Sequence, residues 1–141
     1  MSRKGTDAGH LSASTERFSG RRYIILESYK KDGEPKQTPV QSLEHGGLIF
    51  VRTDPTTWKV KRIRNDPHVR VVPSDRKGKP LGMWADGEAR MLEGEERDKI
   101  LKVFRKEYGA IGYSMVGLVG RMRGERQMTA VISINIRSTQ G

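Results

Sequence analysis

The pattern of hydrophobic and polar positions in the first half of the chain predicts short β-strands joined by turns. Residues 23–29 form the first predicted strand and residues 36–43 its hairpin partner, with turn-forming residues at 31–34. His45-Gly46-Gly47 is a second turn signal, and it leads into a third strand over residues 48–52. This half of the chain is therefore expected to form an antiparallel meander.

The pattern of the second half changes from strands to a helix. Residues 69–72 are predicted to form a fourth strand and residues 81–92 a long fifth strand, in which Gly87 is a candidate β-bulge. Residues 93–108 carry apolar side chains at helical spacing and begin with acidic residues. Such a segment is typical of an amphipathic helix that packs on one face.

The end of the chain completes the predicted fold and leaves one segment open. Residues 110–119 are apolar and contain glycine, so they form either a short helix or a loop that lies against a partner subunit. Residues 127–136 alternate as a closing strand. About six strands with two or three helices predict a protein of the α+β class, mainly antiparallel β, folded as a small closed barrel.

The N-terminal segment differs in composition from the rest. Residues 1–19 are rich in Ser, Thr, Gly and charge, which predicts a mobile basic tail that supplies no core residue. Residues 20–141 are then expected to form a single domain. Because the tail lacks the hydrophobic stretch of a signal peptide and no apolar run is long enough to span a bilayer, we expect a cytoplasmic protein.

The segment from Thr53 to Pro67 combines hydroxyl groups and cations at the start of a predicted helix. Asp54 is the predicted N-cap, Pro55 the first helical residue, and Pro67 ends a helix of about three turns. Backbone N–H groups at a helix N-terminus, together with hydroxyls and cations, supply the donors that a phosphate requires. We interpret the segment as a phosphate cradle.

Two faces are expected on this helix. Val60 and Ile63 share the packing face with Thr56, whereas the residues opposite are Trp58, Lys61 and Arg62, with Lys59 on the border. The candidate phosphate ligands at the N-terminus are Thr53, Thr57 and Lys59. The alternative interpretation is a surface helix whose charged side chains are solvated and bind no ligand.

The formal net charge of +10 indicates an anionic partner. Nucleic acid, an acidic membrane surface or a polyanionic small molecule would each explain it, and the charge alone does not choose among them. The absence of cysteine excludes disulfides, thiolate catalysis and cysteine-bound zinc. Because His10, His45 and His68 are far apart in sequence, no metal site is expected.

Six motifs occur in an order that resembles a known family. They are 23–33 (Tyr-Ile-Ile-Leu-Glu-Ser-Tyr-Lys-Lys-Asp-Gly), Gln37-Thr38-Pro39-Val40, Phe50-Val51-Arg52-Thr53, Thr57-Trp58-Lys59-Val60, Asn65-Asp66-Pro67-His68-Val69 and Leu81-Gly82-Met83-Trp84. Together they resemble the pyridoxamine 5′-phosphate oxidase-related split β-barrel superfamily, and within it the branch of F420-dependent enzymes, the flavin or deazaflavin oxidoreductases. The resemblance covers residues from about 20 to 136.

The resemblance implies a cofactor and the residues that would hold it. In such proteins the strand with Thr38-Pro39-Val40 lays its backbone along the tricyclic ring, Thr53 lies at the ribityl-phosphate, and Thr57-Trp58-Lys59 holds the phosphate. Trp58 would either stack on the cofactor or lie at a dimer seam. Coenzyme F420 is favoured over FMN, since a spread of cations that includes Arg62 suits a tail longer than one phosphate.

The hypothesis is a homodimeric oxidoreductase with the cofactor at the subunit interface and an unidentified small molecule as substrate. Since the cofactor carries the hydride chemistry, no catalytic acid or base is assigned. The rim carboxylates Glu27, Asp86 and Glu88 are expected to be solvated. The C-terminal segment 130–141 lacks the Trp- and Arg-containing motif of pyridoxamine phosphate oxidases, so pyridoxal phosphate synthesis is not predicted.

The competing hypothesis is a small basic β-barrel that binds nucleic acid. Residues 59–64 would supply the charge, and the stacking surfaces would be Trp58, Trp84, Tyr23 or Tyr29. The aromatic content of 6% is low for such a stacking platform.

Overall fold

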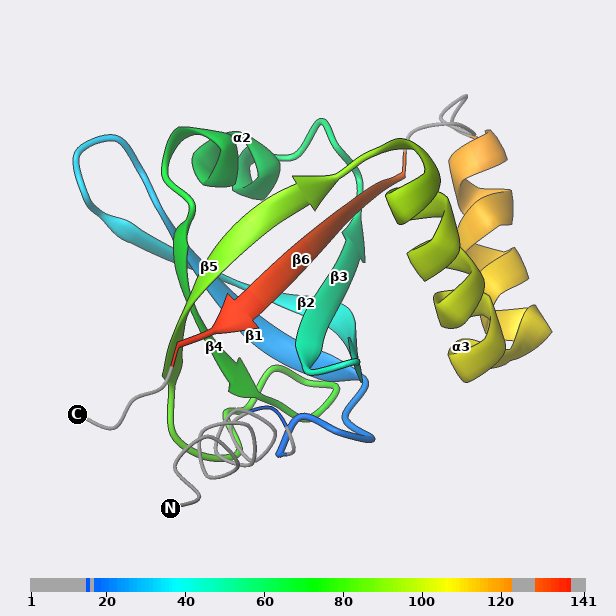
Figure 1. Cartoon of the computed structure of the whole chain (residues 1–141), viewed down its shortest axis with the longest axis horizontal. Coiled ribbons are helices and arrows are strands. Elements are labelled where there is room, and N and C mark those ends of the chain that lie inside the picture. The colour runs from blue at the N-terminus through cyan, green and yellow to red at the C-terminus, as the bar shows by residue number, and fades with distance from the viewer. Residues whose placement is uncertain (1–14, 16, 123–128, 138–141) are drawn as a thin grey trace, which may run out of the picture.

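The computed structural model describes Thr15, residues 17–122 and residues 129–137, with the backbone alone for residues 109–122. The elements follow in the order β1 (Tyr23–Tyr29), β2 (Pro35–His45), β3 (Leu48–Thr53), α2 (Trp58–Asn65), β4 (His68–Pro73), β5 (Ala85–Leu92), α3 (Gly94–Met122) and β6 (Ala130–Ile136). Figure 1 shows the strands wound around one another, with α2 over one end and α3 beside them. Residues 1–14, most of the predicted tail, lie outside the described part.

The strands form a closed barrel in the order β1-β2-β3-β6-β5-β4, and every neighbouring pair is antiparallel. The predicted α+β class, mainly antiparallel β, is confirmed. Alternate residues of a strand point to opposite faces, so Ile24 and Leu26 of β1 point into the barrel while Ile25 and Glu27 point outward.

The ladder between β2 and β3 is shorter than either strand. It runs from the pair Ser42–Val51 to the pair His45–Leu48. The remainder of β2, residues 35–41, pairs with β1, and the end of β3 pairs with β6 through Thr53 and Ala130. The barrel is therefore split between β2 and β3 at the end that leads into α2.

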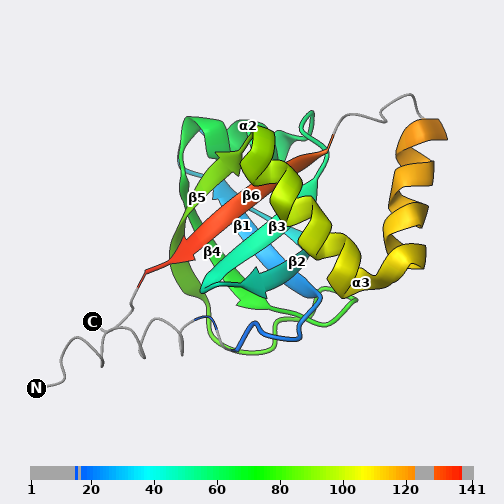
Figure 2. The same ribbon diagram turned by 45° about the vertical axis from the view of Figure 1, so that its right-hand side comes forward.

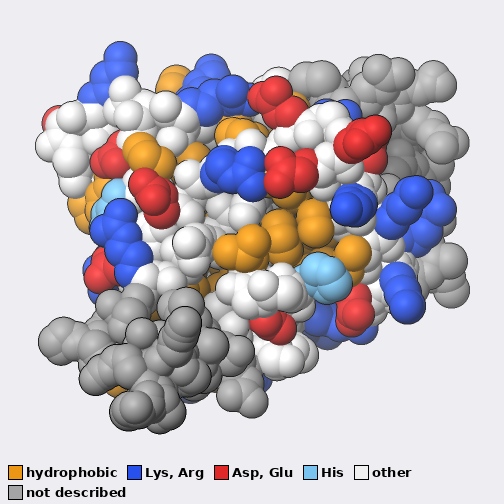
Figure 3. Space-filling view, in the orientation of Figure 1, with side chains coloured by type: hydrophobic (Ala, Val, Ile, Leu, Met, Phe, Trp, Pro, Cys, Tyr) orange, Lys and Arg blue, Asp and Glu red, His pale blue; other side chains and the backbone are white. Residues whose placement is uncertain are grey.

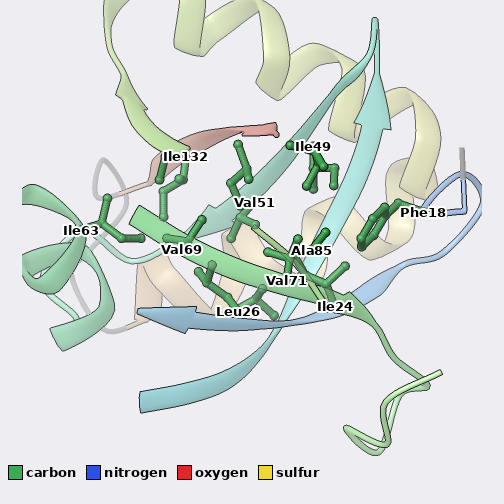
Figure 4. Packing of buried hydrophobic residues seen from close by; sticks show 14 of the residues in the cluster. Phe18, Ile24, Leu26, Ile49, Val51, Ile63, Val69, Val71, Ala85 and Ile132 are labelled. Atoms are coloured by element: carbon green, nitrogen blue, oxygen red, sulfur yellow. The ribbon is translucent and has the colours of Figure 1, made fainter. Parts of the chain in front are cut away.

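The barrel interior is filled by aliphatic side chains, and separate segments close its two ends (Figure 4). Val60 and Ile63 of α2 are buried at one end. Phe18, with 1% of its surface exposed, is buried at the other. The expectation that residues 1–19 contribute nothing to the core is thus wrong, because Phe18 joins the main hydrophobic cluster.

The first part of helix α3 lies across the outside of the barrel, and its later part, yellow to orange in Figure 2, turns away from the barrel. Its residues Ile100 and Phe104 pack with Phe50, Leu92 and Val131 in a second hydrophobic cluster. The helix continues to Met122, so of the two possibilities for residues 110–119 the structure has a helix. No helix in the described ranges is long and apolar enough to cross a membrane.

Strand β5 is shorter than predicted and regular. It begins at Ala85 rather than at residue 81, and Met83 lies in a loop where its carbonyl accepts a hydrogen bond from Arg17. Gly87 pairs with Val69 on one side and Ile136 on the other, so both ladders continue through it and the predicted bulge is wrong.

The glycine at position 87 has a packing role, which leads to a prediction. A Cβ added there would lie 3.0 Å from the carbonyl oxygen of Asn135 and 3.0 Å from Cγ2 of Ile134, both on β6. We expect Gly87→Ala to lower the free energy of unfolding by about 1–3 kcal/mol, because the backbone of β6 must move. Urea unfolding measures this. Glu88→Ala, at the exposed next position, is the control, and equal stability of both variants would contradict the packing role.

Candidate cofactor site

The loop between β3 and α2 has a different geometry from the one predicted. Oδ1 of Asp54 accepts hydrogen bonds from the backbone N–H of Thr56 at 2.8 Å and from its hydroxyl at 2.7 Å, and the Thr57 hydroxyl donates to the Asp54 carbonyl at 2.9 Å. These bonds form a local turn, which competes with helix. The helix therefore begins at Trp58 with Thr57 as N-cap, and the prediction of Asp54 as N-cap and Pro55 as first helical residue is wrong.

The faces of α2 agree with the prediction within the helix itself. It has eight residues, about two turns, with Val60 and Ile63 buried. Trp58 and Lys61 are exposed, and 70% of the Trp58 surface is accessible. Thr56 is exposed rather than on the packing face, because it precedes the helix.

Lys59 and Arg62 are partly buried cations that lie close to each other. Burial lowers the pKa of Lys59 from its usual value, the charge of Arg62 lowers it further, and Asp54 opposes the shift. Burial also lowers the pKa of Arg62, whose Nε donates to the hydroxyl of buried Ser28 at 2.8 Å. Two partly desolvated like charges gain stability from an anion placed near them. The residues present at this point therefore fit a phosphate or carboxylate.

The other predicted cofactor ligands lie on β2 and β3. Val40 points into the barrel core, Pro39 is exposed on the outside, and Thr38 is half-buried. All three lie in the part of β2 beyond its ladder with β3. Thr53 is the last residue of β3 and leads into the turn at Asp54. The predicted ligands thus border the split in the barrel from two strands and the following helix.

A pocket of about 450 Å³ lies between the turn of the β1–β2 hairpin and the exposed face of α2. Figure 1 shows the hairpin turn beside α2, and in Figure 3 Lys and Arg side chains gather at this end of the molecule. We call it the hairpin–helix pocket; its lining consists of Tyr29, Lys30, Lys31, Lys36, Trp58, Lys61, Arg62 and Asn65. Of the predicted ligands it contains Trp58 and Arg62 but not Thr57 or Lys59.

Sequence reasoning missed the hairpin side of this pocket. Residues 31–34 were predicted only as a turn, although Lys31 lies in it and Lys30 and Lys36 lie on either side. The signal was present, because a tight antiparallel turn brings the residues on both sides of it close together. Lys30 N–H donates to the carbonyl of Glu34 at 3.0 Å, which closes this turn.

Glu27 is buried on the outside of the barrel rather than solvated, contrary to the prediction. Only 3% of its surface is exposed, and its carboxylate accepts hydrogen bonds from the Tyr29 hydroxyl at 2.5 Å, Gln37 Nε2 at 2.8 Å and Arg70 at 3.3 Å. The ring of Tyr29 stacks on His68, with centroids 5.2 Å apart. We call these residues the Glu27 network. Asp86 and Glu88 are exposed, as predicted.

The described histidines are not gathered for metal binding. His45 is exposed at the end of β2, and His68 lies 3.5 Å from Asp86 across the β4–β5 ladder. Within the described ranges no group of three His, Cys, Asp or Glu side chains is arranged to hold a metal ion.

A second hollow of about 350 Å³ lies between α3 and the barrel. It is bordered by Leu48 and Phe50 of β3 and by Ile100 and Val103 of α3. In Figure 3 a patch of hydrophobic side chains is visible over β3 and β6 beside α3. This face is a candidate contact surface for a second subunit.

Comparisons with known proteins connect the fold to a class. No family model and no curated protein matches the chain. Among solved structures, general stress protein 26 from Bacillus anthracis is 22% identical, with a TM-score of 0.61 over 90% of this chain and 89% of that one. A general stress protein 26-related protein of the pyridoxinephosphate oxidase family from Clostridium acetobutylicum is 15% identical, with a TM-score of 0.60 over 91% and 84%. The haem storage protein HutZ from Vibrio cholerae is 14% identical, with a TM-score of 0.62 over 93% and 92%.

These similarities define the class of fold. The chain has the fold of the pyridoxamine 5′-phosphate oxidase-like split β-barrel proteins, and the resemblance seen in its motifs is confirmed at that level. This is not the class of nucleic-acid-binding barrel that the charge alone also allowed.

Proposed function

We propose that this protein is an oxidoreductase that binds coenzyme F420 or FMN and transfers a hydride to or from a small molecule. The observation that carries the proposal is the pair of partly buried cations, Lys59 and Arg62, directly after the split between β2 and β3. The fold is shared with a protein of the pyridoxinephosphate oxidase family. We favour F420, since Lys61 and Arg64 extend the positive charge of α2 and suit a longer anionic tail.

The residues of this chain would position the cofactor rather than react. Thr53, Thr57 and Lys59 would hold the phosphate, and Thr38-Pro39-Val40 would lie along the ring, since that part of β2 borders the split. Trp58 and Arg62 would continue the site along α2. When bound, the cofactor supplies the hydride chemistry, and the protein orients its ring and excludes water.

We propose in addition that the active form is a homodimer with the cofactor at the subunit interface. One barrel of this size offers limited surface to cover an extended cofactor. The hollow along α3 supplies a candidate contact face. Its lining combines hydrophobic side chains with polar ones, among them Arg90, Glu96 and Lys99. Light scattering coupled to size-exclusion chromatography measures the mass directly, and a value near 15.9 kDa, the mass of one chain, at micromolar concentration would contradict the dimer.

The experiment that tests the cofactor is a pair of titrations. The purified protein is added to F420 and, separately, to FMN at physiological salt, and the dissociation constant is followed by cofactor fluorescence. Micromolar or tighter binding of one supports the oxidoreductase and selects the cofactor. If neither F420 nor FMN binds with micromolar or tighter affinity, the proposal fails.

Lys59 provides a sharper prediction within that experiment. We expect Lys59→Ala to weaken cofactor binding about tenfold to a hundredfold, as removal of a charge-assisted hydrogen bond to phosphate does. Lys102→Ala is the control, because Lys102 is an exposed cation on α3 that has no part in the proposed site, and we expect its effect to be small. Equal affinities of the two variants would show that charge alone, rather than the position of Lys59, matters.

A further inference from the structure

Residues 74–84, which we call the β4–β5 loop, combine exposed apolar side chains with a cluster of cations. Leu81 and Met83 are two of the three large hydrophobic residues exposed in the described part of the chain, and 77% of the Met83 surface is accessible. Three exposed cations belong to the same loop: Arg76, Lys77 and Lys79. Among the described residues, these three side chains form no ion pair. The loop therefore offers apolar surface next to unmatched positive charge.

The β4–β5 loop is held in shape by its own hydrogen bonds. Oδ1 of Asp75 accepts the backbone N–H groups of Lys77 at 2.9 Å and of Lys79 at 2.8 Å. The N–H of Leu81 donates to the carbonyl of Pro73, the last residue of β4, at 2.8 Å. A backbone fixed in this way loses less entropy when the loop binds a surface.

The chain before β1 adds positive charge beside this loop. A guanidinium nitrogen of Arg17 donates to the carbonyl of Met83 at 2.5 Å. Arg21 is exposed shortly before β1, and the N–H of Ser74 donates to the Tyr23 carbonyl at 3.0 Å, so the loop starts next to β1. Figure 1 shows both segments, green and blue, at the end of the barrel opposite α2. Five cations and two exposed apolar side chains therefore share one end of the molecule.

This combination of side chains matches an anionic membrane surface. Aliphatic side chains enter the boundary between headgroups and acyl chains, and lysine and arginine bind the anionic headgroups around them. Nucleic-acid bases instead stack on exposed aromatic rings. The aromatic residue of the loop, Trp84, is half-buried, with the Arg70 guanidinium 5.0 Å from its ring centre. A symmetric contact with a second copy would bring two sets of five cations together, which is unfavourable.

We propose that the β4–β5 loop binds this protein reversibly to a membrane surface that contains anionic lipids. Leu81 and Met83 enter the interface, and the five cations contact the headgroups. The contact is reversible because two apolar side chains and a few cations make a weak anchor. The inference does not depend on the proposed function, since none of these residues is a predicted cofactor ligand. The loop approaches the predicted ligands at Gly78, next to Pro39, so the test includes competition with the cofactor.

Sedimentation of sucrose-loaded vesicles with the full chain tests this surface. One set of vesicles is phosphatidylcholine alone, and the other contains about one third phosphatidylglycerol. We expect binding to the anionic vesicles to be at least about tenfold tighter at about 0.1 M salt, and most of it to be lost at about 0.5 M salt. No binding to the anionic vesicles at millimolar lipid, or equal binding to both sets, would overturn the proposal.

Substitutions at exposed positions locate the contact. Met83→Ser should weaken binding to the anionic vesicles about tenfold, and Lys77→Gln about fivefold. Trp58→Ser, at an exposed hydrophobic residue of α2, and Lys102→Gln, at an exposed cation of α3, are the matched controls and should change binding little. Equal losses in the controls and the loop variants, or unchanged binding when Met83→Ser and Lys77→Gln are combined, would place the contact elsewhere and overturn the proposal.

Three further measurements test the other occupants of this surface. Light scattering should give the same mass for Met83→Ser as for the wild type, and a lower mass would make the loop a subunit contact instead. Single-stranded DNA of about ten nucleotides should not release the protein from vesicles, and release would indicate a nucleic-acid surface. Saturating FMN or F420 should leave vesicle binding unchanged, and release by the cofactor would overturn an independent membrane contact. Failure of the cofactor titrations with vesicle binding intact concerns the proposed function alone.

Discussion

Phe104→Ala is expected to lower the free energy of unfolding by about 3–5 kcal/mol, the typical cost of removing a buried phenylalanine ring. Phe104 is fully buried, and its ring holds α3 against the outer face of β3 and β6. The ring of Tyr108 lies 5.7 Å away, and the Arg52 guanidinium lies 5.4 Å from the ring centre. Arg52 lies on β3, and Tyr108, which follows Phe104 on α3, donates hydrogen bonds from its hydroxyl to the carbonyls of Ser42 and Arg22. Both neighbours are therefore held in place and cannot close over the cavity.

Chemical denaturation followed by circular dichroism measures this loss. Lys102→Ala is the control, because it lies on the same helix with an exposed side chain, and its effect should stay within about 0.5 kcal/mol. Tyr108→Phe provides an intermediate case: it keeps the ring but removes the hydroxyl near the carbonyls of Ser42 and Arg22. A change below about 1 kcal/mol for Phe104→Ala would contradict a packed contact between α3 and the barrel.

The strands were predictable because their signals are local. Residues 23–29 were predicted and found as β1, since a run of β-branched and aromatic residues ended by a Gly-containing turn has few other solutions. Val60 and Ile63 were placed on the buried face of α2 from helical spacing alone. Closure of the barrel followed from the number of antiparallel strands, which leaves edges to be paired.

The errors arose where a distant or competing contact determines the structure. Phe18 belongs to a polar segment by composition, but it fills the end of the barrel, and only the assembled fold creates that space. Aspartate is a common N-cap residue, but the Asp54 side chain accepts a hydrogen bond from the backbone N–H of Thr56 and forms a turn instead. Gly87 suggested a bulge, whereas the reason for glycine is the close approach of β6.

One part of the candidate site could likewise be predicted from the sequence, and another part could not. The cations of α2 were visible in the sequence, because all of them lie within residues 59–64 of one short helix. Their grouping with Lys30, Lys31 and Lys36 depends on how the hairpin turn lies beside α2. The spacing of hydrophobic and polar residues in the sequence does not indicate this placement. The burial of Glu27 depends on partners from three strands, Tyr29, Gln37 and Arg70, which only the register brings together.

Glu27→Gln is expected to lower the free energy of unfolding by about 2–3 kcal/mol. The substitution keeps the shape of the side chain but replaces one acceptor oxygen with an NH2 group. At the Oε1 position this group faces the donor Gln37, and at the Oε2 position it faces the donors Tyr29 and Arg70. Buried donors left without an acceptor carry this order of cost. Glu88→Gln, an exposed position on β5, removes the same charge and should change stability little.

The pH dependence of the stability difference between the wild type and Glu27→Gln identifies the cause of the loss. Burial raises the pKa of Glu27, but the hydrogen bonds from Tyr29 and Gln37 and the charge of Arg70 outweigh it, so the pKa lies below its ordinary value of 4.5. A lowered carboxyl pKa contributes stability that is fully present above the unfolded pKa and is lost as the pH falls through the folded one. The stability gap between the wild type and Glu27→Gln should therefore stay constant from pH 7 to pH 5 and narrow below it. Urea unfolding at each pH measures the gap, and a gap that persists unchanged in acid would assign the loss to packing rather than to the ionised carboxylate.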